Sequence, residues 1–175
     1  MTLTIRPGHT PADVAAVALL HTLSRRDAYR DLLTPAELAE VTVERQHQSW
    51  SQRWAAESDT HRMHLAERDG ELLGFCYLGP ADPAAEQAPP GTGMLNAIHV
   101  RPDAVGSGVG LALMRTCLAG FADLGHTRAM LYVVRENDRA RRFYERGGWA
   151  ADGVARETMI GSASVPIVRY ARAIP

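Results

Sequence analysis

The sequence predicts a mixed α/β fold with several antiparallel strand pairings, as a single domain over residues 1–175. Strand and helix patterns alternate in the order β-α-α-β-β-β-α-β-α-β-β. An Asp69-Gly70 turn joins two neighbouring strand patterns as a hairpin. A glycine-rich turn at residues 106–110 connects a strand pattern to a long helix with one apolar face. This order of elements is that of a mixed α/β domain with several antiparallel pairings.

One strand and two helices are predicted in the first third of the chain. Residues Thr2–Arg6 alternate and are rich in β-branched side chains, which is typical of a strand. Residues 10–13 (Thr-Pro-Ala-Asp) combine a capping threonine, a proline and an acidic residue, which indicates a helix start. Residues 34–37 repeat the signal, and we expect that helix to run to about Ala56. Residues 24–33 are charged and predicted to be irregular.

A hairpin, a loop and a helix follow. His64–Arg68 and Leu72–Leu78 are the hairpin strands. Residues 80–93 contain four prolines and two glycines and are predicted to be an irregular loop. Met94–Val100 is the next strand. The helix after the glycine turn is expected to end at Gly125, and these residues form its buried face: Gly110, Leu113, Met114, Cys117, Leu118 and Phe121.

Three strands and one helix complete the chain. The strands are predicted at Ala129–Val134, Trp149–Val154 and Val165–Ala171. Asn137 is expected to cap a short helix that ends at the glycine pair 147–148.

Composition excludes several functional classes. A net charge of −1 removes the electrostatic attraction that nucleic-acid binding needs. All 19 basic residues are arginine, which excludes a P-loop lysine and a Schiff-base lysine. Neither a membrane span of about 20 apolar residues nor a signal-peptide core is visible. Cys76 and Cys117 lie in apolar runs and are expected to be buried. We therefore expect a cytoplasmic protein that binds neither nucleic acid nor membranes.

The glycine turn predicts an anion site. Glycines at 106, 108 and 110 leave backbone N–H groups bare, and the helix that begins there adds unpaired donors and a positive dipole end. A purely structural turn is the alternative. The turn is neither a P-loop nor a G-x-G-x-x-G fingerprint, because lysine is absent and the third glycine comes one residue early.

Two segments together resemble the GNAT superfamily of acyl-CoA N-acyltransferases. IHVRPDAVGSGVGLALM resembles its acyl-CoA motif, and LYVVRENDRARRFYERGGW resembles its C-terminal motif. AYRDLLTPAEL and VRYAR resemble bacterial small-molecule-type members. The resemblance implies a mixed, mostly antiparallel sheet with a splayed central strand pair, flanked by about four helices. It also implies acetyl-CoA as co-substrate and no metal.

The resemblance assigns coenzyme contacts residue by residue. The backbone of Ile98, His99 and Val100, at the splay, would hold the pantetheine arm. Val105 stands where the family usually begins the turn with Gln or Arg. Asn137 would bond near the pantetheine as well as cap its helix. The amides expected to hold the pyrophosphate are those of Gly106, Ser107, Gly108, Val109 and Gly110.

The resemblance also implies the catalytic groups. Tyr144 would protonate the departing thiolate, a role that suits a phenol with an ordinary pKa of about 10. Its neighbour Phe143 is expected to be the core residue of that pair. Met94 stands at the family's glutamate base. Asn96 could orient a water, and His99 is either a base or a polar residue at the sheet face.

The expected function is transfer of an acetyl group from acetyl-CoA to a primary amine of a small molecule by direct attack. Two alternatives stay open: a protein N-terminal acetyltransferase, and a non-catalytic acyl-CoA-binding regulatory domain. Tyr29, Arg30 and Asp31 are candidates for an acceptor pocket, and a homodimer is compatible with the sequence.

Overall fold

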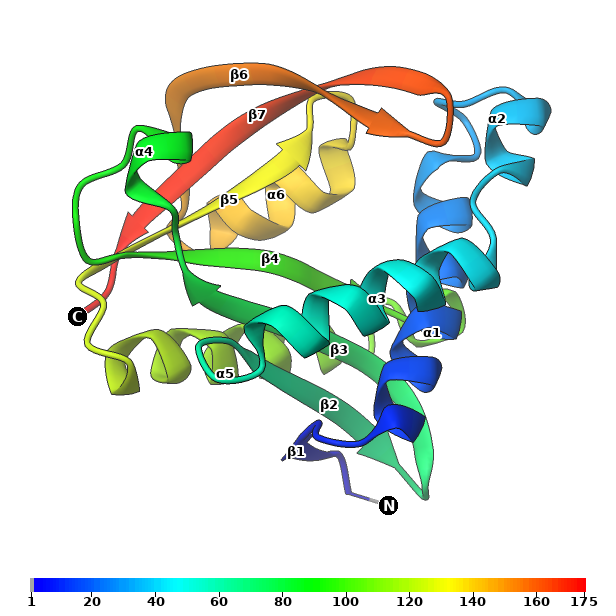
Figure 1. Ribbon diagram of the computed structural model, residues 1–175, viewed down its shortest axis with the longest axis horizontal. Helices are drawn as coiled ribbons and strands as arrows, with labels where there is room; N and C mark the ends of the chain where they lie inside the picture. The colour runs from blue at the N-terminus through cyan, green and yellow to red at the C-terminus, as the bar shows by residue number, and fades with distance from the viewer. Residues whose placement is uncertain (1) are drawn as a thin grey trace.

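The computed structural model describes residues 2–175 and contains one seven-stranded sheet with helices on both faces (Figure 1). The strands follow the order β1-β2-β3-β4-β5-β7-β6. Neighbouring strands are antiparallel except for β4 and β5, which are parallel. The predicted mixed, mostly antiparallel sheet is confirmed. The strands are β1 Thr4–Pro7, β2 Arg62–Arg68, β3 Glu71–Pro80, β4 Thr92–Val100, β5 Arg128–Val134, β6 Ala150–Ile160 and β7 Ala163–Ala173.

The parallel pair β4 and β5 separates partway along its length. Residues 92–95 pair with residues 128–131, and the later residues of both strands have no partner in the other. On the opposite side, Tyr77 pairs with Ala97 and Leu78 pairs with Leu95, so Asn96 is an extra residue in β4. Such a bulge bends its strand. The central strand pair is therefore splayed, as predicted.

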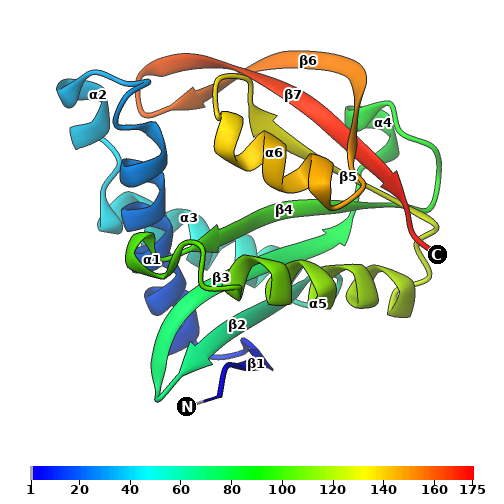
Figure 2. The same cartoon turned by 180° about the vertical axis from the view of Figure 1, so that it is seen from behind.

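Six α-helices lie in the described part of the chain, and four of them have nine or more residues. Helices α1 and α3 cover one face of the sheet, and α5 and α6 cover the other (Figures 1 and 2). Over residues 2–175, none of these helices combines the length and apolarity that crossing a bilayer requires. The helices are α1 Pro11–Tyr29, α2 Pro35–Ala39, α3 Val43–Glu57, α4 Pro83–Glu86, α5 Val109–Asp123 and α6 Asp138–Arg146.

Alternation along β3 divides the core into two layers. Phe75 and Tyr77 are fully buried with Trp50, under α1 and α3. Cys76 and Leu78 are fully buried in the cluster under α5. A strand with both faces covered reads as a continuous apolar run, as this one does.

The N-terminal helices differ from the prediction in their bounds. Helix α1 continues through residues 24–29, which were predicted to be irregular, because this part of the helix lies against β4 and buries Ser24. The single helix expected from residue 34 to 56 is two helices. The chain leaves α2 at Ala39, buries Val41 and restarts at Thr42, whose side chain caps α3.

Residues 80–93 and the last two strands also differ from the prediction. Within 80–93, Asp82 caps the four-residue helix α4, which is too short to leave a periodic pattern. Strands β6 and β7 meet at residues 160–163, well inside the gap expected between them. Strand β6 lies at the edge of the sheet and is mostly exposed, so its outer half lacks the alternation that would predict it.

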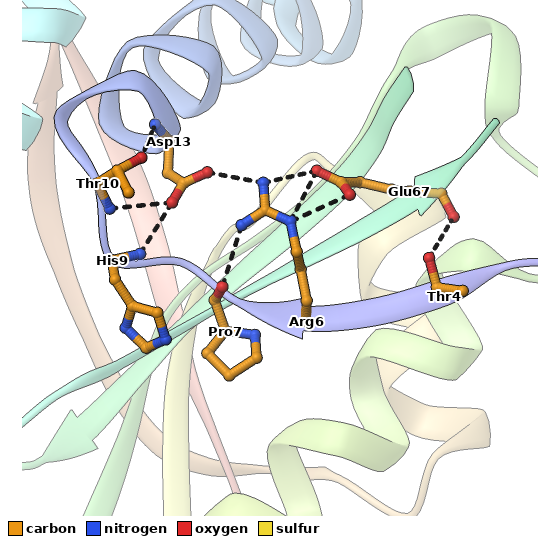
Figure 3. A network of polar contacts seen from close by, with 7 residues as sticks. All are labelled: Thr4, Arg6, Pro7, His9, Thr10, Asp13 and Glu67. Atoms are coloured by element: carbon orange, nitrogen blue, oxygen red, sulfur yellow. Dashed lines mark hydrogen bonds and ion pairs between the residues drawn. The ribbon is translucent and has the colours of Figure 1, made fainter. Parts of the chain in front are cut away.

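A polar network fixes the start of α1 against the first two strands (Figure 3). The Arg6 guanidinium lies 2.7 Å from Asp13 Oδ1 and 2.7 Å from Glu67 Oε1. Asp13 Oδ2 accepts hydrogen bonds of 2.9 Å from the N–H groups of His9 and Thr10. Arg6 and these N–H groups hold the pKa of Asp13 well below its usual value. Because α1 also forms a wall of the cavity described below, this network helps to position that wall.

Candidate active site

A cavity of about 800 Å³ opens at the splay between β4 and β5. Its walls come from α1, α3, α4, β6 and β7, and the N-terminal part of α5 and one face of α6 close the remaining side. It therefore brings together both segments of the family resemblance. The volume suits a small ligand or the end of a larger one.

The glycine turn presents free backbone donors to this cavity. Gly106 and Gly108 have φ angles of +85° and +88°, and nothing lies within 4 Å of a Cβ built on either residue. Gly108 caps α5. Within residues 2–175, the amides of Gly106, Gly108, Val109 and Gly110 have no backbone acceptor. Unpaired amides at a helix start form an anion site.

The other residues assigned to the turn have different positions. Val105 lines the cavity. Ser107 does not, and its N–H and hydroxyl both donate to the Ala104 carbonyl, at 3.2 and 2.6 Å. Its amide is therefore engaged within the protein, which differs from the expectation that it holds the pyrophosphate. The side chain of Val109 is fully buried in the core, so only its backbone is available.

The splayed strand and the cap of α6 form the next part of the wall. Ile98, His99 and Val100 all line the cavity along the edge of β4 that β5 leaves unpaired. Asn137 lines it too, and its Oδ1 accepts a hydrogen bond of 3.1 Å from the Ala140 N–H. Because capping uses the oxygen, the amide nitrogen is the group that Asn137 can offer to a ligand.

Tyr144 lies deep in the cavity wall, with 8% of its surface exposed. Burial, with a smaller effect from Tyr29, raises the pKa of its phenol well above the usual value. The hydroxyl therefore stays protonated. Phe143, expected to be the core residue of the pair, is the less buried of the two and also lines the cavity.

His99 is a neutral imidazole in this setting. Burial, with a smaller effect from Arg25, lowers its pKa to about 3. Its Nδ1 lies 3.0 Å from the Ser24 hydroxyl, and its ring centroid is 4.3 Å from that of His21. A group with so low a pKa holds a proton poorly, which weighs against His99 as the base.

Asn96 and Met94 line the cavity beside the point where β4 and β5 separate. The Asn96 Oδ1 is buried and has no hydrogen-bond partner within residues 2–175. Met94 is buried and cannot accept a proton. Asn96 thus offers the polar atom that the strand lacks at position 94. An unpartnered buried acceptor is costly unless a ligand or water completes it.

A carboxylate that the sequence did not indicate lies in the cavity wall opposite α1. Glu86 of α4 accepts a 2.7 Å hydrogen bond from the Tyr132 hydroxyl and pairs with Arg156 at 3.2 Å. The Arg156 guanidinium lies 3.9 Å from the centre of the Tyr132 ring. No sequence signal marks Glu86, because its helix is too short and lies in the proline-rich segment.

A second missed group lies on α1. His21, Arg25 and Tyr29 recur every fourth residue on one helix face, and all three line the cavity. Of the acceptor-pocket candidates, Tyr29 lines it and Arg30 and Asp31 do not. The spacing of these three residues in the sequence indicates a shared helix face, but only if the helix is known to continue to residue 29. No group of three His, Cys, Asp or Glu side chains in the described chain is placed to hold a metal.

The fold and part of the sequence are similar to those of known acetyltransferases. A GCN5-related N-acetyltransferase of Rhodopseudomonas palustris superposes with a TM-score of 0.76 and 17% identity, over 99% of this chain and 96% of that one. The PaiA N-acetyltransferase of Thermoplasma acidophilum, solved in complex with coenzyme A, gives 0.69 and 17%, over 97% and 98%. At these identities the similarity concerns the fold.

Sequence similarity is higher over a shorter segment. A mycothiol acetyltransferase of Streptomyces avermitilis is 42% identical over 86 residues, which is 49% of this chain and 26% of that protein. The match thus spans about a quarter of that relative's length. The sequence model of the acetyltransferase (GNAT) family matches residues 26–149, from the last turn of α1 to just beyond the end of α6. This chain belongs to the GNAT family.

Proposed function

We propose that this acetyltransferase moves an acetyl group from acetyl-CoA to a primary amine of a small molecule, by direct attack within a ternary complex. The observation that carries the proposal is a single cavity that joins the free amides of the α5 turn, the unpaired edge of β4 and the Tyr144 phenol. These groups match the three parts of the donor: its pyrophosphate, its pantetheine arm and its leaving thiol.

The coenzyme end relies mainly on backbone groups. The amides at Gly106, Gly108 and Gly110 would donate to the pyrophosphate oxygens, aided by the positive end of the α5 dipole. The free edge of β4 would hold the amide-bearing pantetheine arm as an added strand. Val105 supplies no polar side chain, so the site depends on the backbone N–H groups of the turn.

The chemistry then needs one bond formed, one broken and two protons moved. The amine nitrogen attacks the thioester carbonyl carbon, the C–N bond forms and the C–S bond breaks. The thiolate takes the phenolic proton of Tyr144, which is in place beforehand because burial raises the pKa of that phenol. Solvent then returns a proton to the phenolate. The attacking nitrogen loses its extra proton to water, which the free Asn96 Oδ1 is placed to orient.

Two observations favour a small acceptor. The acceptor wall carries fixed polar groups from α1 and α4, as pockets for small ligands do. The similar protein of Streptomyces avermitilis is named for mycothiol, a small molecule.

The direct test is thiol release from acetyl-CoA against a panel of amino acids, polyamines, aminoglycosides and short peptides, with mass spectrometry of the products. We expect acetylation of one class of small amine above the background hydrolysis measured without acceptor. Acetylation of peptides alone would establish the N-terminal acetyltransferase alternative. Tight binding of acetyl-CoA without thiol release on any acceptor would establish a binding domain.

A further inference from the structure

We propose that the acceptor of this enzyme carries a carboxylate in addition to its amine, and that Arg25 binds that carboxylate in the cavity. The inference deepens the proposed function, because it names the substrate class of the same site, and it rests on that function. It starts from an imbalance of charge in the cavity wall.

Arg25 lies in the middle of the α1 face that lines the cavity. His21 precedes it by one turn and Tyr29 follows it by one turn. The Arg25 guanidinium lies 5.9 Å from the centre of the Tyr29 ring, and its residue is half-buried. Its position in a helix that the Asp13 network and the sheet hold in place makes it a fixed feature of the wall.

Arg25 is the cavity arginine without an anionic partner. Four arginines line the cavity. Three of them pair with a carboxylate of the protein: Arg53 with Glu57 at 3.5 Å, Arg139 with Asp27 at 3.5 Å, and Arg156 with Glu86 at 3.2 Å. Within residues 2–175, no carboxylate oxygen lies close enough to the Arg25 guanidinium, 4.0 Å or less, to form an ion pair with it.

The two neighbours of Arg25 on the same face of α1, and His99 of β4, are neutral. Burial lowers the pKa of His99 to about 3 and also lowers the pKa of His21, so both imidazoles are uncharged near neutral pH. Burial raises the pKa of Tyr29, so its phenol keeps its proton. The positive charge of Arg25 is therefore uncompensated in a partly desolvated site, where a ligand anion gains the most from pairing with it.

The position of Arg25 favours the acceptor over the coenzyme. His99 of β4 stacks on Phe75, a residue of the core layer under α1 and α3, and lies beside His21. The pyrophosphate amides belong to α5, which covers the opposite face of the sheet. A lone guanidinium presents two parallel N–H groups, a geometry that matches one carboxylate. Polyamines and aminoglycosides would instead meet a like charge.

The test uses acceptors that differ only in this charge. The efficiency kcat/KM is measured for amino acids and for their primary amides, at equal concentrations of free amine so that the lower basicity of the amides does not contribute. We expect the wild-type enzyme to prefer the acids by about tenfold or more, the size of one charge-assisted contact. Arg25→Gln should abolish the preference by raising KM for the acids.

The matched control is Arg30→Gln. It removes the same charge from the end of the same helix, at an exposed residue outside the cavity, and should leave the preference intact. Thermal melting of both variants checks that they fold. KM for acetyl-CoA should not change in either variant.

Several results would overturn the inference. Equal efficiency on acids and amides in the wild type would overturn it and leave the proposed function standing. A raised KM for acetyl-CoA in Arg25→Gln would assign the contact to the coenzyme. A preference for O-phosphoethanolamine over β-alanine would replace the carboxylate by a phosphate. Failure to acetylate any amine would overturn the proposed function and this inference with it.

Discussion

Two arginine-containing sites lie near the two ends of α1, and they differ in whether the arginine has a carboxylate partner in the protein. At the start of the helix, Arg6 contacts both Asp13 and Glu67, and Asp13 accepts backbone N–H groups as well (Figure 3). In the second half of the helix, Arg25 has no carboxylate partner, and the buried Asn96 Oδ1 and the α5 amides of the same cavity also lack protein partners.

The difference separates a structural site from a binding site. A polar group that is satisfied within the protein contributes to folding and has little left to offer a ligand. A desolvated group that is left unsatisfied costs stability, and a ligand that completes it recovers that cost as binding free energy. Substitutions in the first region should therefore change stability, and those in the second should change catalysis and binding.

The largest expected effect is on catalysis, from Tyr144→Phe. The substitution keeps the ring and its contacts with Trp149 and Phe143 and deletes the proton donor. We expect kcat to fall by roughly 10²–10⁴-fold, the usual contribution of general acid catalysis, with little change in KM for acetyl-CoA. Steady-state kinetics with the best acceptor measures both.

Tyr132→Phe is the matched control, because it deletes a phenol from the same cavity that is already hydrogen-bonded to Glu86. We expect its effect to be confined to the acceptor KM. The Tyr144→Phe defect should shrink with an acyl donor whose thiol is more acidic, because that thiolate needs less protonation. Near-normal kcat in Tyr144→Phe would show that water supplies the proton.

The next largest effect is expected on coenzyme binding, from Gly108→Val. Gly108 adopts a φ of +88°, which a β-branched residue avoids, and the change would turn the amides that face the pyrophosphate. We expect acetyl-CoA affinity to fall by about 100-fold or more, since loss of about 2.7 kcal/mol from two charge-assisted hydrogen bonds has that effect. Calorimetry measures it.

Gly125→Val controls for the strain. Gly125 ends the same helix with a φ of +78° and open space around its Cβ position. It should lose stability to a similar extent and keep its affinity for acetyl-CoA. Equal losses of affinity in the two variants would mean that the helix as a whole, rather than its amino end, accounts for the binding.

The backbone features of the proposed coenzyme half could be predicted from sequence because their determinants are local. A glycine turn before a helix and an asparagine before another are short patterns whose backbone consequences hold in most contexts. The structure has Gly108 and Asn137 as the caps of α5 and α6. The splay of β4 and β5 followed from the family resemblance.

The acceptor half could not be predicted, because it depends on which distant segments meet. Glu86 comes from a four-residue helix, and its partners Tyr132 and Arg156 come from β5 and β6. Arg25 lies in a stretch whose charges favoured an irregular segment, and only its packing against β4 shows that the helix continues. Tertiary contacts override local preference at such places.

A smaller effect is expected in the pH dependence of the rate, which tests whether any group of the cavity acts as a catalytic base. Because burial lowers the pKa of His99 to about 3 and also lowers the pKa of His21, neither imidazole of the cavity titrates near neutral pH, and the free amine fraction of the acceptor should set the rate. We expect kcat/KM to rise about tenfold per pH unit below the acceptor's pKa and then level off. Acceptors that differ in basicity should shift this limb accordingly.

His99→Gln tests the same point in the enzyme. It keeps a hydrogen-bonding group near Ser24 and should leave the shape of the pH profile unchanged. A limb near 6.5 that ignores the acceptor, and that disappears in His99→Gln, would make His99 the base.

The smallest effect is expected from a substitution in the network at the start of α1, and it should change the stability of the protein but not its activity. Asp13→Asn keeps the size of the side chain but weakens the cap and the pair with Arg6, while Glu67 still contacts Arg6. We expect the free energy of unfolding to fall by about 1 kcal/mol, the typical value of a helix cap. Urea unfolding measures this loss, and acetyl-CoA affinity should stay the same.

The pH dependence of that loss gives the comparison its sharpest test. The pKa of Asp13 is lower in the folded protein, so its stabilisation is complete above the unfolded pKa of about 4 and declines as pH falls through the folded pKa. The wild type and Asp13→Asn should therefore differ at pH 7 and converge in acid. Glu37→Gln is the control, because Glu37 holds the same capping position on the exposed helix α2 and has no arginine partner among residues 2–175. A pH-independent difference in Asp13→Asn would mean that the carboxylate charge contributes nothing and that the network acts through shape alone.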